Sequence, residues 1–456
     1  MNKNDKDFLG TAPIGKLLLS LALPTITAQL INMLYNIVDR IYIGHIPEAG
    51  ALALTGVGVC MPLILIVSAF AALVGSGGAP RASILMGKQE HDQAEQILGN
   101  CFALLFLISI VLTVILLAWN RPILLAFGAS ENTIEYARDY LFFIALGAPF
   151  IMFGTAFGNI LRGEGASRES MIGNLIGTIV NIVLDPIMIL VLGWGVTGAA
   201  LATIIGNIAA CLYYIAYYLR GKSTLSIHFR DFKMGDGIAV AVAAIGIPAS
   251  LNNILMSFAN IILNQALVGY GDTPVAAMGV AMKSNMLVVL LQIGLCVGIQ
   301  PLIGYNYGAR NKKRLMSVFK FTGFGSVIMG TIVTLFMIVA RKTMIQMFIN
   351  DAEVGQYGIQ MVVALQLSAP FLGIIFLCIN TIQGMGKALP SLILTICRQG
   401  LIFIPLIFIL NHLFGLDGVI YAQPTADYLS IMVGVIICTH LFRTMKHQRQ
   451  VSSFFE

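Results

Sequence analysis

The sequence predicts an all-α integral membrane protein with 12 transmembrane helices, arranged in two pseudo-symmetric six-helix bundles around a central cleft. Composition is the first reason: 58% of residues are hydrophobic and only 11% are charged, whereas soluble domains carry about 25% charged residues. The second reason is a series of charge-free stretches long enough to cross a hydrocarbon core of about 30 Å. The third is an internal repeat that covers nearly the whole chain.

The repeat has a constant offset. GNILRGEG at 158–165 returns as INTIQGMG at 379–386, so Asn159 matches Asn380 at an offset of 380 − 159 = 221. The segment APF recurs at the same offset. Self-similarity of this kind indicates two copies of one structural unit. With six spans in each copy, both have the same orientation and are related by an axis along the membrane normal.

The predicted spans follow the apolar stretches in order, and each contains at least about 20 residues. They are 17–43, 52–86, 96–119, 136–161, 168–192, 196–219, 238–268, 275–306, 315–340, 356–382, 389–412 and 419–442. The first stretch carries Asp39 and precedes eleven more, so we expect a membrane span there rather than a signal peptide.

The predicted domains are an N-terminal six-helix lobe (1–221), a polar cytoplasmic linker (222–237) and a C-terminal six-helix lobe (238–456). Most Lys and Arg residues lie on the side that holds both termini. The positive-inside rule places that side in the cytoplasm, so we expect the chain in the inner (cytoplasmic) membrane with both termini inside. This bias accounts for the net charge of +6, so no nucleic-acid partner is expected. We also expect a monomer.

Cysteine and histidine patterns do not indicate a metal centre. The seven cysteines lie in or beside apolar stretches without a C-x-x-C pair, and the six histidines are scattered. The spans also lack the signature of a membrane protease or another metal-dependent enzyme. We therefore expect no cofactor and no enzymatic activity.

A few charged side chains expected within the bilayer interior are the candidate functional residues, because each costs about 2.5–3.5 kcal/mol on insertion scales. They are Asp39, Asp185, Lys283, Arg398 and Asp427.

The first two charged residues are predicted to meet in the outer third of the membrane. Asn181 and Asp185 share a helix face at i, i+4, as do Ala199 and Thr203. This gathers Asp39, Asp185, an amide and a hydroxyl in the first bundle. Two close carboxylates in a low dielectric hold either a shared proton or a cation between them. The structural alternative is that each Asp caps a broken helix or pairs with a neighbouring polar group.

The other charged residues are candidates for the cleft or for structural pairing. Lys283 is interpreted either as a cation that changes partners during transport or as a snorkelling, paired structural residue. Asp427 aligns with Asn207 in the first copy, because 427 − 207 = 220. We expect it to pair with Arg398 of the preceding span.

Five segments resemble characteristic motifs of the multidrug and toxic compound extrusion (MATE) family, over essentially the full chain. They are YNIVDRIYIG (35–44), GGAPRASILMGK (77–88), LRGEG (161–165), NIVLDP (181–186) and PLIGYNYGAR (301–310). The wording of LRGEG and NIVLDP is similar to the DinF-like and MepA-like bacterial members. The chain departs from the NorM-like branch, which places carboxylates in spans 7 and 10, because 237–271 and 354–386 contain no acidic residue here.

The resemblance implies a cation-coupling site and a hinge. The implied site consists of Asp39, Asn181, Asp185 and Thr203 with the main-chain oxygen of Ala199, and would hold Na⁺ or a proton. The implied hinge is Pro24, which precedes the aspartate by 39 − 24 = 15 positions. Proline removes a helical hydrogen bond, which makes bending physically reasonable.

The expected function is secondary active multidrug efflux, in which hydrophobic, cationic organic compounds leave in exchange for H⁺ or Na⁺. The alternative is a lipid-linked oligosaccharide or lipid flippase of the same superfamily, which would need a strongly basic cavity. A membrane-embedded enzyme or a channel is less favoured. The sequence leaves the choice of ion, the stoichiometry and the natural substrate open.

Overall fold

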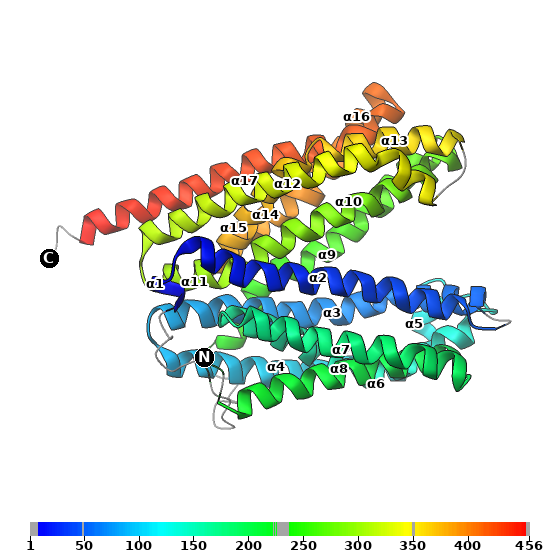
Figure 1. Cartoon of the computed structure of the whole chain (residues 1–456), viewed down its shortest axis with the longest axis horizontal. Helices are drawn as coiled ribbons and strands as arrows, with labels where there is room; N and C mark the ends of the chain where they lie inside the picture. Colours follow the sequence, from blue (N-terminus) through cyan, green and yellow to red (C-terminus); the bar gives the residue numbers. More distant parts are fainter. Residues whose placement is uncertain are drawn as a thin grey trace. The chain divides into compact units, whose positions relative to one another are not determined.

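A computed structural model gives the structure of residues 8–47, 50–221, 223, 225, 237–348 and 352–452. Throughout these residues the secondary structure is helical (Figure 1). The predicted linker, 222–237, lies almost entirely outside the described residues.

The first half of the chain forms six membrane-length helices with short helices between them. They are α1 (Phe8–Thr11), α2 (Ile14–Gly44), α3 (Gly50–Gly87), α4 (His91–Ala118), α5 (Asn120–Ala126), α6 (Ile134–Gly163), α7 (Ser167–Pro186), the π-helical segment η2 (Ile187–Val191) and α8 (Gly195–Leu219).

The second half repeats this pattern with more interruptions. Its helices are α9 (Ile238–Val268), α10 (Asp272–Gly298), α11 (Gln300–Gly308), α12 (Lys312–Phe348), α13 (Ala352–Gln366), α14 (Ala369–Gly384), α15 (Ala388–Ile396), the π-helical segment η4 (Cys397–Ile402), α16 (Phe403–Phe414) and α17 (Leu416–Ser452).

Helix boundaries reproduce the offset of the sequence repeat. The ends of α6 and α14 differ by 384 − 163 = 221, and the starts of α7 and α15 differ by 388 − 167 = 221. The ends of α3 and α11, and likewise the starts of α8 and α17, differ by the same offset. The two halves therefore contain the same helices in the same order, as the repeat predicts.

Eleven helices or joined helical segments are long and apolar enough to cross a membrane in the described part of the chain, and a bent pair brings the total to twelve. The bent pair is the predicted span 356–382, which is split into α13 and α14 with an angle of 47° between them. Pro370, in the first turn of α14, has no backbone N–H to bond the end of α13. The twelve predicted spans agree with this set in number, and the break is the main difference.

Packing contacts divide the chain into a first unit (1–250 with 304–311) and a second unit (251–303 with 312–456). The sequence-based boundaries are different, since they assign 238–250 and 304–311 to the C-terminal lobe. Glycines explain the grouping, because they let backbones approach closely. A Cβ on Gly77 would lie 2.0 Å from the carbonyl oxygen of Val242, and one on Gly308 would lie 2.0 Å from that of Ile84.

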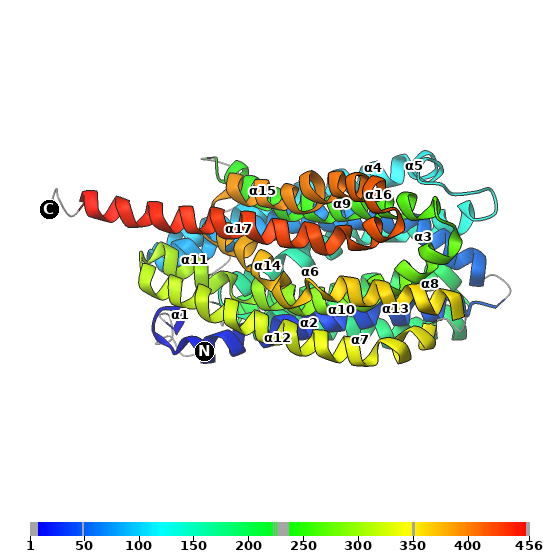
Figure 2. The ribbon, with the colours of Figure 1, turned by 90° about the horizontal axis from the view of Figure 1, so that it is seen from above.

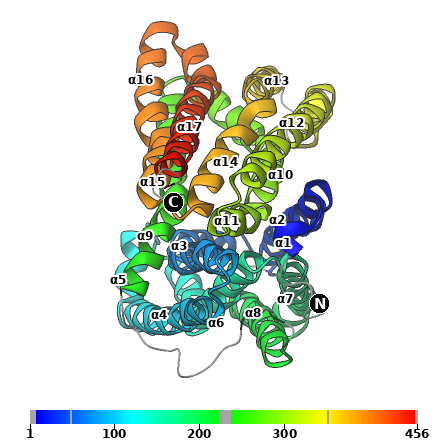
Figure 3. The same cartoon turned by 90° about the vertical axis from the view of Figure 1, so that its left-hand side faces the viewer.

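In the first unit, α6 packs against α3 and α8, and α7 lies between α8 and α2. Figure 3 shows α4, α6, α7 and α8 almost end-on, as neighbouring parallel cylinders. This arrangement brings residues of α2, α7 and α8 into one interior region, and all four predicted site side chains lie on these three helices.

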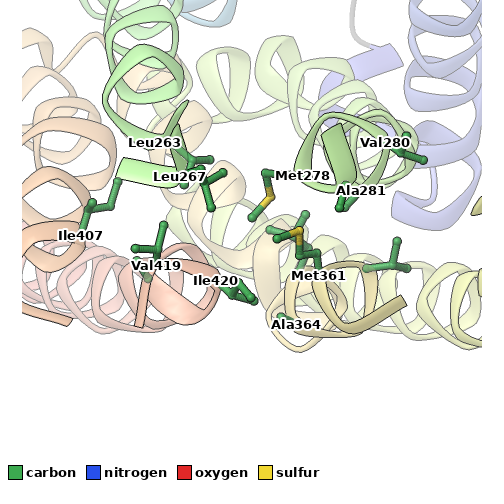
Figure 4. Packing of buried hydrophobic residues seen from close by; sticks show 14 of the residues in the cluster. Leu263, Leu267, Met278, Val280, Ala281, Met361, Ala364, Ile407, Val419 and Ile420 are labelled. Carbon is green, nitrogen blue, oxygen red and sulfur yellow. The ribbon is translucent and has the colours of Figure 1, made fainter. Parts of the chain in front are cut away.

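In the second unit, α17 runs along α14 and α16 and is seen over its full length in Figure 2. The core of this unit is made mostly of aliphatic and methionine side chains, together with Phe403. Leu263 and Leu267 of α9, Met278 of α10, Met361 of α13 and Ile420 of α17 form one buried cluster (Figure 4).

We expect Gly77→Ala to destabilise the first unit by about 2 kcal/mol or more, because overpacking a tight contact costs about 1–3 kcal/mol. The melting temperature of purified protein in detergent measures the loss. Gly58→Ala in the same helix is the control, because a Cβ there meets nothing within 4 Å. Equal melting temperatures for both variants would contradict the close approach of α3 to Val242.

Candidate ion-coupling site

The structure brings Asn181, Asp185 and Thr203 into contact. Asn181 Nδ2 lies 3.5 Å from Asp185 Oδ1 and 3.4 Å from Thr203 Oγ1. The i, i+4 spacing puts the first two on one face of α7, and the packing of α7 on α8 brings Thr203 opposite them. Ala199 is fully buried one turn before Thr203 on α8.

Asp39 of α2 is also buried, and its carboxyl group interacts electrostatically with that of Asp185. Within the described residues, no Lys or Arg forms an ion pair with either aspartate. Asp39 Oδ1, Asp185 Oδ2 and Asn181 Oδ1 are buried without a hydrogen-bond donor. Buried, unpaired carboxylate oxygens in a membrane protein need a proton or a cation to offset their charge.

The donor set fits either occupant chemically. Carboxylate, amide and hydroxyl oxygens are the ligands that hard cations prefer, whereas two neighbouring carboxyl groups can also share one proton. Among the described residues, no group of three or more His, Cys, Asp or Glu side chains could hold a metal ion. A sodium site here would therefore depend on Asn181 and Thr203 as well as on the two aspartates.

Two tyrosines at the site were not predicted. The hydroxyl of Tyr35 lies 3.2 Å from Thr203 Oγ1, and Tyr140 of α6 is buried close enough to interact electrostatically with Asp39 and Asp185. Tyr35 stands at i−4 from Asp39, so the helical spacing could have identified it. Tyr140 has no such signal, because only tertiary packing brings α6 to the cluster.

A polar pocket extends from the cluster into the first unit. Its volume is about 190 Å³, and about 750 Å³ when the open mouth is included. Tyr35, Asn181 and Thr203 line one part, while Asn159 and Arg162 line another. Since a water needs about 10–15 Å³ measured in this way, the pocket has room for several waters or part of an organic molecule.

The predicted hinge lies in a continuous helix. Pro24 is inside α2, and α2 is helical on both sides of it. The hydroxyl of Thr25 donates to the carbonyl oxygen of Leu21 at 2.8 Å, and that of Thr27 donates to the carbonyl oxygen of Leu23 at 2.9 Å. These hydroxyl bonds add to the helical bonds of the same oxygens, whereas the carbonyl oxygen four residues before Pro24 lacks its helical donor because proline has no backbone N–H. A bend there would break few helical hydrogen bonds.

In the second unit, Arg398 and Asp427 form the expected pair. Arg398 Nε lies 3.4 Å from Asp427 Oδ1, and both side chains are almost completely buried. Ser368 donates to Asp427 at 2.9 Å, and the Arg398 guanidinium stacks over the ring of Phe376. The π-helical segment η4 carries Arg398 into this position. Lys283 of α10 has an exposed side chain.

The buried charges, the apolar spans and the duplicated helices define a multi-pass membrane transporter, embedded in the lipid bilayer. Comparison with known proteins identifies its family. The MatE family model matches residues 24–187 and again residues 248–409, once in each copy of the repeat. The chain belongs to this family, the MATE transporters, and is therefore not an enzyme.

Two curated relatives have the same extent as this chain. The multidrug export protein MepA of Staphylococcus aureus (strain MSSA476) is 30% identical over 430 residues, covering 93% of this chain and 94% of the relative. MepA of Staphylococcus haemolyticus is 29% identical and covers 93% of each.

A solved structure has the same fold over nearly the full length. The outward-facing conformation of a multidrug resistance MATE family transporter of the MOP superfamily superposes with a TM-score of 0.91. Its sequence is 25% identical, and the alignment covers 98% of this chain and 100% of that one.

We expect Asp427→Asn to destabilise the protein by about 3–5 kcal/mol, because it leaves the buried Arg398 cation without a counter-ion. Thermal melting in detergent measures the effect, and Asp272→Asn at the exposed start of α10 is the control. Combining Asp427→Asn with Arg398→Gln should recover part of the loss. If Asp427→Asn melts like the control, the pair contributes no stability.

Proposed function

We propose that this protein is a multidrug efflux antiporter that exports hydrophobic, cationic organic compounds in exchange for H⁺ or Na⁺. One observation carries the proposal. Asp39 and Asp185 are buried beside a polar pocket with no basic ion-pair partner among the described residues. Such a site is stable only when something positive occupies it. The names of the curated relatives support export of drugs as the use of this site.

Coupling follows from competition for the same negative charge. A proton or Na⁺ bound at Asp39 and Asp185 removes the attraction for a cationic substrate, and a bound substrate removes the need for the ion. Mutual exclusion of two ligands is a coupling free energy between their sites, as antiport requires. The ion enters along its own gradient, and its arrival drives the substrate out.

Movement is assigned to α2. Asp39 and Pro24 lie on the same helix, so a change in the charge of Asp39 alters the contacts of the segment that Pro24 can bend. Tyr35, one turn from Asp39, joins α2 to Thr203 of α8 through a hydroxyl contact. Loss of this contact would let α2 bend and narrow the pocket.

The same proposal includes the location, orientation and oligomeric state of the protein. The chain is placed as a monomer in the inner (cytoplasmic) membrane, with both termini in the cytoplasm and lobes at 1–221 and 238–456. It needs no cofactor beyond the coupling ion. A flippase for lipid-linked sugars would need a strongly basic cavity, but Arg162 is the only basic residue among those that line the described pocket.

We expect Asp39→Asn and Asp185→Asn each to lower ethidium efflux from cells at least tenfold at unchanged expression. Neutral amides can neither hold the proton nor attract the cation. Asp139→Asn, at an exposed position of α6, is the matched control and should transport normally. Efflux at the wild-type rate in both site variants would refute the coupling site.

Replacing Na⁺ by choline distinguishes the ions. If Na⁺ is the coupling ion, efflux in proteoliposomes stops in choline, and Thr203→Ala weakens the dependence on Na⁺ because it removes one oxygen ligand. If H⁺ is the coupling ion, efflux continues in choline and stops when the pH gradient is dissipated. Transport that survives both treatments would contradict antiport.

A further inference from the structure

Arg162 is a charged group that the coupling mechanism does not use. It lies in the last turn of α6, and its side chain lines the polar pocket of the first unit. Its guanidinium donates to Ser170 Oγ of α7 at 3.3 Å and to Asn159 Oδ1 of its own helix. Tyr214 of α8 contacts the same part of α7, because its hydroxyl donates to the carbonyl oxygen of Ser170 at 2.9 Å.

The charge of Arg162 has no acidic counter-ion in the described residues, since no carboxylate forms an ion pair with it. The nearest carboxylate in sequence, Glu164, is bonded by Tyr218 at 2.7 Å and by Ser223. A guanidinium has five N–H donors, and two of them make the bonds named above. A half-buried guanidinium that lines a pocket and has no acidic counter-ion can bind an anion or a strong acceptor.

The pocket therefore has a negative end and a positive end. Asn181 and Thr203, which contact Asp185 or lie next to it, line one end, and Ser170 and Tyr214 line the other. Ser170 and Asn181 are separated by about three turns of α7, which is about 16 Å along a helix. Thr203 and Tyr214 are separated by the same interval on α8, so both helices give the same length for the pocket.

We propose that Arg162 determines substrate specificity by binding a carboxylate of the exported molecule. The pocket then takes amphoteric compounds, with the ammonium group toward Asp39 and Asp185 and the carboxylate on Arg162. Two charges of opposite sign at the two ends of a low-dielectric pocket orient a dipolar ligand along the pocket. This inference rests on the proposed function and specifies its substrate class.

If the role of Arg162 is purely structural, the expected result is different. A cation in the last turn of a helix interacts favourably with the helix dipole, and the bonds to Asn159 and Ser170 join α6 to α7. Loss of that role would impair transport of every substrate equally. Loss of a carboxylate-binding group impairs only substrates that carry a carboxylate.

Rhodamine B and its ethyl ester are suitable probes, because both carry the cationic xanthene and differ only in the free carboxylate. Efflux of each dye is measured in proteoliposomes with wild-type protein, Arg162→Gln and Arg162→Lys. Arg168→Gln is the matched control, because Arg168 is exposed in the first turn of α7 and does not line the pocket. The readout is the ratio of the two rates within each variant.

We expect wild type to export rhodamine B at least as well as the ester. Arg162→Gln should lower the ratio at least tenfold, Arg162→Lys should lower it less, and Arg168→Gln should leave it unchanged. An equal loss of both dyes, or an unchanged ratio, in Arg162→Gln overturns the inference. If Arg162→Gln does not fold, the wild-type protein tests the inference. Export of the ester by wild type without export of rhodamine B also overturns the inference. Failure of wild type to export the ester contradicts the proposed function itself.

Discussion

The negative charge of Asp39 and Asp185, which no ion pair balances, is the constraint on which the rest of the first unit depends. Burying two carboxylates inside a membrane bundle costs free energy, and an ion pair with a basic side chain would offset most of that cost. The described residues provide no such pair, and offer an amide, a hydroxyl and a tyrosine instead. In the proposed function, this leaves the site open to a mobile positive charge, which a permanent ion pair would exclude.

In the second unit, by contrast, the buried carboxylate has a basic partner. Asp427 has Arg398 beside it, a serine hydroxyl bonded to it, and an aromatic ring under the guanidinium. The pair is neutral and satisfied at the carboxylate. One copy of the repeat thus holds buried carboxylates without an ion pair among the described residues, and the other holds a carboxylate paired with an arginine. The two copies share their helices but differ in their electrostatics.

Much of this could be predicted from the sequence, because it depends on local periodicity. The spans follow from apolar length, and the contact of Asn181 with Asp185 follows from the i, i+4 spacing. Tyr140 and the extension of the pocket to Arg162 could not be predicted, since both depend on how α6 packs against α7 and α8. The assignment of 238–250 to the first unit also escaped prediction, because the close glycine contact joins residues far apart in the chain, Gly77 and Val242.

The same proline position lies in a continuous helix in the first copy of the repeat and beside a break between two helices in the second. Pro370 corresponds to Pro149, because 370 − 149 = 221, yet α6 is a single helix through Pro149 while α13 and α14 meet beside Pro370 at an elbow. A stiff rod carries displacement from one end to the other, whereas an elbow lets its two arms turn separately. A displacement at one end of α6 can therefore reach the other end of that helix. In the second copy, a displacement of α14 can be taken up at the break before it reaches α13.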